Sequence, residues 1–256
     1  MTETEWETTR HVCSVMLPLL RQRKIPGTKS GRRKLRLFTA AVCRLAWALL
    51  PPSDRAAIEL MEKVADGHGG DQDLKQTAVA LAKENAPIPD YAKPLLDTPD
   101  KRNAAVYASM VICFSLERPA YQGAYECSRW ACDIPGRLAH GDHGFMRLHK
   151  ECRAEADRVH AEILRDVFGN LFRPLPAVAF PASVRGVAEG VYESQDEAGY
   201  QVLADALEEH GQLEQALDSA WVDVASGLYL PIKHLRQPAW PHVKGCHVVD
   251  WARSVL

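Results

Sequence analysis

A group of histidine, cysteine and aspartate residues near the C-terminus has the chemistry to bind a metal ion. It consists of His234, His242, Cys246, His247 and Asp250. Imidazole nitrogen, thiolate sulfur and carboxylate oxygen are the ligands that Zn²⁺ takes in proteins. His242 and Cys246 would share one face of a helix, but Gly245 favours a helix that begins near Cys246 and leaves His242 in a turn. The zinc-site hypothesis takes four ligands from this group, His242, Cys246, His247 and Asp250, and its alternative is a buried cysteine beside a turn-capping histidine.

A second group of potential metal ligands lies in the middle of the chain. Its members are His140, His143, His149 and Cys152. His149 and Cys152 are three positions apart and would share a helix face, while the other two histidines sit in a glycine-rich turn. Cys127 and Cys132 lie nearby, but their spacing does not match a zinc knuckle. The alternative is a solvated, histidine-rich turn beside buried cysteines, and apart from zinc no cofactor is indicated.

A basic segment, residues 21–36, has the charge to bind phosphate groups. It holds eight Lys or Arg residues and no acidic residue: Arg21, Arg23, Lys24, Lys29, Arg32, Arg33, Lys34 and Arg36. Clustered cations of this kind contact phosphates of nucleic acids, although no aromatic residue is interleaved for base stacking. The alternatives are a solvated loop or a partner for the acidic stretch 191–218, which has eight acidic residues and no Lys or Arg. The net charge of −2 conceals this asymmetry.

Reaction motifs are missing from the sequence. There is no GxSxG, HExxH or GxGxxG pattern, and GTKSG does not have the frame of a phosphate-binding loop. Cys246 is the best-placed nucleophile, but His247 would point about 100° away from it on a helix. The sequence therefore favours a protein that is not an enzyme.

The elements that position these residues are predicted to be helices. Leu35, Phe38, Val42, Leu45 and Leu49 recur at intervals of three and four, which predicts a central, buried helix. Similar periods elsewhere, with no alternating strand pattern, predict an all-α fold of roughly nine or ten helices in an irregular bundle. Gly186 and Gly190 share a predicted helix and would allow a neighbouring backbone to approach closely. The next predicted helix contains Leu203 and Leu207 and is expected to end at Gly211.

Proline-rich connectors divide the predicted helices. Four prolines fall between residues 87 and 99, and others cluster at 174–181 and 231–241. Each proline lacks an amide donor and disfavours a helix interior. We expect one helical domain over residues 1–256, with candidate lobes at 1–85, 100–168 and 182–256. No apolar run is long enough to span a membrane.

Several segments resemble an uncharacterised protein family abundant in planctomycete bacteria. They are MTETEW at the N-terminus, RKLRLF (Arg33–Phe38), LRDVFGNLFRP (Leu164–Pro174), LADALEEHG (Leu203–Gly211) and PHVKGCHVVD (Pro241–Asp250). Roughly half of the chain is covered. The family has an alanine-rich middle that residues 86–140 lack, and it has Arg and Trp where Lys244 and His247 stand here. The resemblance implies a bacterial helical protein and supplies no activity.

Three functions remain open from the sequence. The first is a non-enzymatic helical module for protein interaction or regulation, with a protein partner or a second copy of the chain. The second is a phosphate- or nucleic-acid-binding protein that uses the basic segment. The third is a metal- or thiol-dependent enzyme that uses His242, Cys246 and Asp250. The acidic N-terminus and the odd number of cysteines favour a cytoplasmic location.

Overall fold

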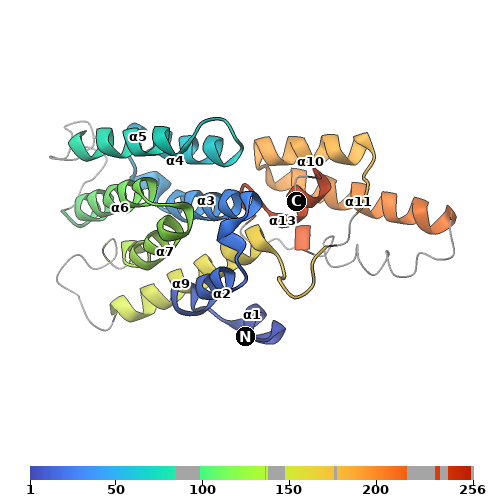
Figure 1. Cartoon of the computed structure of the whole chain (residues 1–256), viewed down its shortest axis with the longest axis horizontal. Helices are drawn as coiled ribbons and strands as arrows, with labels where there is room; N and C mark the ends of the chain where they lie inside the picture. The colour runs from blue at the N-terminus through green and yellow to red at the C-terminus, as the bar shows by residue number, and fades with distance from the viewer. Residues whose placement is uncertain are drawn as a thin grey trace. The chain divides into compact units, whose positions relative to one another are not determined.

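The computed structural model describes residues 1–84, 99–135, 137, 148–175, 178–217, 234–236 and 242–254. This part of the chain contains α-helices, short helical turns and no β-strand, which confirms the all-α prediction. The helices are α1 (Glu3–Thr8), α2 (Leu17–Gln22), α3 (Lys29–Arg44), α4 (Pro52–Ala65), α5 (Asp71–Glu84), α6 (Pro99–Glu117), α7 (Ala120–Ala131), α9 (Leu148–Phe168), α10 (Ala182–Ser194), α11 (Glu197–Leu217) and α13 (His247–Ala252), labelled in Figure 1. None of the described helices is long and apolar enough to cross a membrane.

The chain forms two compact units, an N-terminal unit of residues 1–163 and a C-terminal unit of residues 164–256. The division falls within α9, so the last turn of that helix belongs to the C-terminal unit. The candidate lobes 1–85 and 100–168 both fall largely within the N-terminal unit. The predicted connector between them lies outside the described residues except for Pro99, which is the first residue of α6. The glycine-rich turn with His140 and His143 also lies outside them.

Helix α3 forms the centre of the N-terminal unit, as its apolar period predicts. It packs against α4 and α7, while α6 packs against α5 and α7. Leu35, Phe38 and Val42 are fully buried. Leu45 is 56% exposed, contrary to the predicted stripe, because α3 ends at Arg44. A short 3-10 turn, Trp47–Leu49, follows, and Leu50 then takes the extended conformation that a following proline favours.

The N-terminal segment is less regular than its sequence predicts. Thr4 and Glu7 have the spacing of a capping box, but the box that forms consists of Thr2 and Glu5. Pro18 lies in the first turn of α2, where its missing amide leaves no bond unmade. A π-helical turn, Val12–Met16, precedes that helix.

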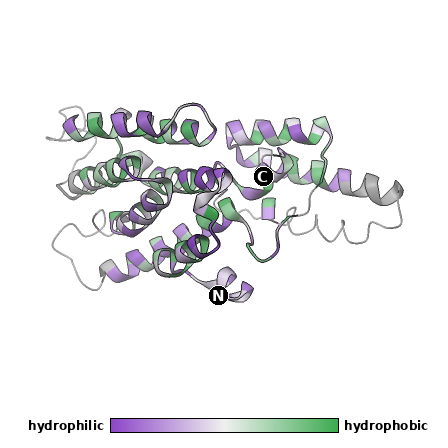
Figure 2. Cartoon of the chain, in the orientation of Figure 1, coloured by the Kyte–Doolittle hydropathy of each residue, from purple (hydrophilic) through white to green (hydrophobic). Residues whose placement is uncertain are grey.

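In the C-terminal unit, α10 packs against α11 and α13. Hydrophobic and hydrophilic residues alternate along α10, as Figure 2 shows. Its buried residues Val184, Ala188 and Val191 face a core completed by Leu203 and Trp251.

Two expectations about glycines in the C-terminal unit are wrong. No atom lies within 4 Å of a Cβ built on Gly186 or Gly190, so these residues make no close backbone contact. The predicted end of α11 at Gly211 is also wrong, because the helix continues to Leu217. A helix-interior glycine costs about 1 kcal/mol relative to alanine, which the rest of a long helix can offset.

Candidate metal centre

The candidate site begins with a carboxylate in an unfavourable place. Asp166 lies in the last turn of α9 and is fully buried. The C-terminal end of a helix carries partial negative charge, and removing a carboxylate from water costs several kcal/mol unless it is compensated. Gly169, at φ +70°, ends the helix three residues later. Asp166 therefore needs positive charge or hydrogen-bond donors from elsewhere in the fold.

A tight turn brings two of the candidate ligands to this carboxylate. The amide of Cys246 donates to the carbonyl of Val243 at 2.9 Å, which closes a four-residue turn. Gly245 is the third residue of that turn and has φ +91°, a conformation that glycine adopts without strain. His242 precedes the turn, and Cys246 ends it at the residue before α13. The HxxGC spacing therefore places an imidazole and a thiol side by side.

His234 supplies a second imidazole from a short helical turn. The next residue, Leu235, is buried in the core of the C-terminal unit. Arg236 then donates hydrogen bonds to Asp205 and Glu208 of α11, each at 2.6 Å. The buried Leu235 and the ion pairs of Arg236 thus fix the backbone next to His234.

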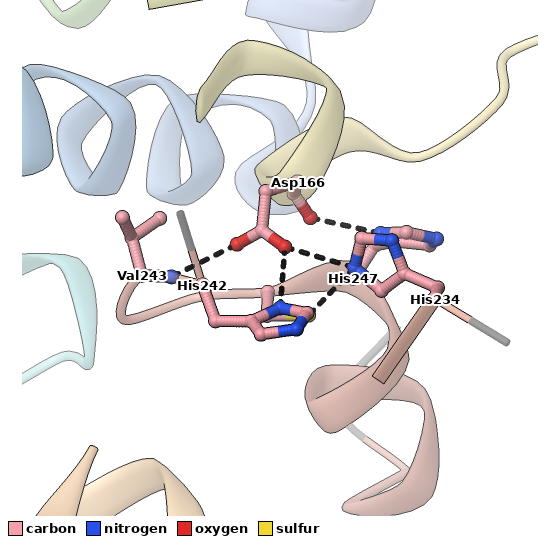
Figure 3. Close-up of polar contacts among 6 residues, drawn as sticks. Asp166, His234, His242, Val243 and His247 are labelled. Atoms are coloured by element: carbon pink, nitrogen blue, oxygen red, sulfur yellow. Dashed lines mark hydrogen bonds and ion pairs between the residues drawn. The ribbon is translucent and has the colours of Figure 1, made fainter. Parts of the chain in front are cut away.

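Four side chains converge at this point, namely Asp166, His234, His242 and Cys246. Asp166 Oδ1 accepts hydrogen bonds from His234 Nε2 at 2.9 Å and from His242 Nδ1 at 3.1 Å. Cys246 Sγ lies 3.4 Å from His234 Nε2 and 4.0 Å from His242 Nδ1. One potential ligand atom from each residue lies within 4.8 Å of all the others. Figure 3 shows the carboxylate pointing towards the imidazole rings.

These separations match the edges of a zinc tetrahedron. Zinc bonds of about 2.0 Å to nitrogen and oxygen and about 2.3 Å to sulfur require ligand separations of about 3.3 Å for nitrogen–oxygen pairs and about 3.6 Å for sulfur–nitrogen pairs. The two nitrogen–oxygen and two sulfur–nitrogen distances above differ from these values by about 0.4 Å or less. The side chains would therefore move little to take up an ion.

Burial controls the electrostatics of the group. The side chains of His234 and His242 are 14% and 9% exposed, and those of Asp166 and Cys246 are buried. Burial by itself raises the pKa of Asp166, but hydrogen bonds and charge attraction from the two histidines outweigh burial and hold that pKa well below its usual range. Burial, together with the negative charge of Asp166, raises the pKa of the Cys246 thiol well above its ordinary value.

Further contacts hold the ligand atoms in place from outside the group. The amide of Val243 donates to Asp166 Oδ2 at 3.0 Å, which leaves Oδ1 facing the histidines. His247 Nδ1 lies 2.8 Å from the main-chain oxygen of Asp166 (Figure 3). The ring of Tyr200 stacks on His242 with centroids 4.4 Å apart. Supporting contacts of this kind orient ligands in metal sites.

Two of the sequence-predicted ligands, His242 and Cys246, are part of this group, and two are not. His247 contacts the backbone of Asp166 and belongs to the surroundings of the group. Asp250 is buried and lies 3.5 Å from Arg253. Asp166 is not among the sequence-predicted ligands, and its only signal is an acidic residue in the last turn of a helix, three positions before a glycine stop. His234 was in the wider group but was not chosen as a ligand.

The second predicted site is not assembled by the described residues. His140 and His143 lie outside them, and no side-chain position is described for His149. Cys152 is half-buried on α9. A different trio, Cys132, Asp157 and His160, comes together in the N-terminal unit. The Cys132 thiol lies 3.0 Å from both Asp157 Oδ1 and the carbonyl of Ser128, so its single proton has an acceptor without an ion.

Much of the basic segment is engaged within its own unit. Arg33 lies 3.2 Å from Asp66, and Arg36 pairs with Asp71. Lys34 is buried, and Arg32 donates to the carbonyl of Gly27 at 2.7 Å. The exposed cations are Arg21, Arg23, Lys24, Lys29 and Arg32. Phosphate binding stays a prediction, and phosphates would compete with two intramolecular ion pairs.

Comparison with known proteins adds nothing to these observations. No protein-family model, no curated protein and no solved structure matches the chain. The resemblance to a planctomycete family therefore stays a prediction, and function has to be argued from the site.

Proposed function

We propose that this protein is a structural zinc protein, in which one ion bound by Asp166, His234, His242 and Cys246 joins the last turn of α9 to the C-terminal segment. The convergence of four ligand atoms within 4.8 Å carries this proposal. Catalytic zinc sites keep an open coordination position beside three protein ligands, whereas structural sites are closed by four. Four buried or nearly buried protein ligands favour the structural role and agree with the missing reaction motifs.

The ligand types favour zinc over other common ions. Calcium and magnesium take oxygen ligands almost exclusively, which a set of two imidazoles and a thiolate does not supply. Zinc accepts nitrogen, sulfur and oxygen together in tetrahedral geometry.

Cobalt substitution tests the proposed ligand set. Metal-free protein titrated with Co²⁺ is expected to develop intense visible absorption from a tetrahedral ion and a sulfur-to-cobalt charge-transfer band, both saturating at one ion per chain. Cys246→Ser should remove the charge-transfer band, and Cys113→Ser, a half-buried cysteine of α6, should leave it unchanged. A charge-transfer band that survives in Cys246→Ser would contradict the proposed ligands.

The proposed role of the zinc-bound unit is protein interaction within the cytoplasm. Its support is indirect, namely a closed site, the missing reaction motifs and the uneven charge of the sequence. A pull-down with tagged protein tests it, with half of the sample treated with nuclease. We expect protein partners that remain bound after nuclease treatment. The Cys113→Ser variant should retain these partners, and the Cys246→Ser variant should lose them. Partners lost with nuclease would favour the basic segment and nucleic acid.

A further inference from the structure

The N-terminal unit contains an apolar cavity that the zinc site does not explain. Its volume is about 490 Å³ and it lies between the end of α3, the end of α7 and α9. Most of its wall is made of apolar side chains, among them Val42, Ala131, Ile134, Ala156 and Val159. Sites that bind small molecules usually enclose 300–1,000 Å³ and are lined in this way. The cavity therefore has the size and surface of a ligand site.

A single histidine adds a polar group to the apolar wall. His160 lines the cavity and is 1% exposed. Its Nδ1 atom lies 3.3 Å from Ser128 Oγ and 3.5 Å from Cys132 Sγ, and no partner is found for Nε2 among the described residues. Burial lowers the pKa of His160 to about 4, so the ring is neutral at pH 7 and compatible with an apolar ligand.

Two glutamates mark the outer edge of the cavity. Glu151 and Glu155 line it and are exposed to solvent. Glu155 pairs with Arg158, whereas Glu151 has no partner among the described residues. A carboxylate that no described cation neutralises favours a ligand with a cationic end and disfavours an anionic one.

Leu45 adds an exposed apolar side chain to the lining of the cavity. Leu45 lines the cavity and is 56% exposed, although its place after α3 continues a buried apolar stripe. An apolar ligand would cover this side chain together with the wall beneath it. Removing both from water would contribute to binding.

We propose that this cavity binds an amphiphilic amine, with its apolar body between α3, α7 and α9 and its ammonium group beside Glu151. Specificity follows from the two ends of the site. The wall selects for aliphatic length, and the glutamate selects for positive charge. This proposal is independent of the zinc site, because every residue that lines the cavity belongs to the N-terminal unit.

Displacement of Nile red, a neutral apolar dye, by ten-carbon ligands tests the proposal on the full-length protein. Decylamine, decanol and decanoate share one chain and differ in the head group. We expect saturable displacement at one site per chain, with decylamine at least fivefold tighter than decanol and decanoate weakest. Shortening the amine to eight carbons should weaken binding about fifteenfold, because each buried methylene contributes about fourfold.

Two variants locate the binding site. Val159→Trp fills the cavity and should weaken decylamine binding at least tenfold, while Val79→Trp, at a half-exposed valine of α5, should leave it unchanged. Glu151→Gln should remove the preference for decylamine over decanol. Circular dichroism confirms that each variant is folded. The proposal would be overturned by unsaturable displacement, by equal affinity for the three head groups, or by Val159→Trp binding decylamine like the unaltered protein.

Discussion

Burial of His160 should make the N-terminal unit sensitive to mild acid. The imidazole is 1% exposed, and burial lowers its pKa from 6.5 to about 4. Two neutral groups face it, the Ser128 hydroxyl and the Cys132 thiol. The Asp157 carboxylate contacts that thiol and lies within 4.8 Å of a nitrogen of the ring, and together with burial it raises the pKa of the thiol. A hydrogen bond with the Ser128 backbone raises the pKa of His160, but burial outweighs it and keeps the ring neutral at pH 7.

The sign and size of the effect follow from these two pKa values. As the pH falls below 6.5 the unfolded chain takes up a proton at this histidine, while the folded protein does not until about pH 4. The stabilising contribution of the neutral ring is complete above pH 6.5 and is lost between pH 6.5 and 4. A difference of about 2.5 between the pKa values corresponds to about 3 kcal/mol of unfolding free energy.

Urea unfolding at several pH values measures this contribution. Unaltered protein and His160→Asn, in which the amide takes the place of Nδ1, are unfolded from pH 7 to 4.5 with a chelator present, so that metal release does not contribute. The carboxylates and the other histidines titrate in both proteins, so the difference between their pH profiles isolates His160. We expect the unaltered protein to lose about 2 to 3 kcal/mol more than the variant. Parallel profiles would refute the reasoning.

Other predictions concern glycine positions and an interhelical ion pair. Gly169→Ala should destabilise the protein by about 2 kcal/mol in thermal unfolding, because residue 169 has φ +70° and a Cβ there would lie 2.6 Å from the ring of His247. Gly186→Ala on α10, with open space around it, should stabilise by about 0.5 to 1 kcal/mol, and equal effects of the two changes would contradict this reading. Arg44 donates two hydrogen bonds to the buried Glu62 at 2.6 and 2.9 Å, so Arg44→Gln should cost about 2 kcal/mol in urea unfolding after allowance for the partial exposure of Arg44. Adding Glu62→Gln to Arg44→Gln should recover part of that cost, and a further loss of similar size would show that the pair does not act as a unit.

The sequence predicts those parts of the fold that depend on local spacing. The buried face of α3 follows from Leu35, Phe38 and Val42, because residues three and four apart share a helix face. The prediction fails at Leu45, since α3 ends at Arg44 and the chain continues in a separate 3-10 turn, Trp47–Leu49. The prediction for Gly211 places the end of α11 too early, because a glycine permits a helix to end without requiring it.

The candidate site, too, is predictable only where its residues are close in the sequence. The spacing of His242, Gly245 and Cys246 defines a turn, so their proximity could be read from the sequence. Asp166 lies 76 residues from His242, and only tertiary packing brings the two together. His234 depends likewise on the burial of Leu235. Ligands distant in sequence could not be identified from spacing alone, although the buried-acid signal at the end of α9 was present.

Metal content and stability, measured on the same preparations, test the zinc site most directly. The unaltered protein and the control Cys113→Ser, purified with zinc present and then desalted, should each retain about one zinc per chain by elemental analysis. His242→Gln and Cys246→Ser should retain almost none. Chelation should lower the unfolding midpoint of the unaltered protein and of Cys113→Ser, and should not change that of the two ligand variants. An unaltered protein that holds no zinc, or a Cys246→Ser variant that holds as much as the control, would contradict the account.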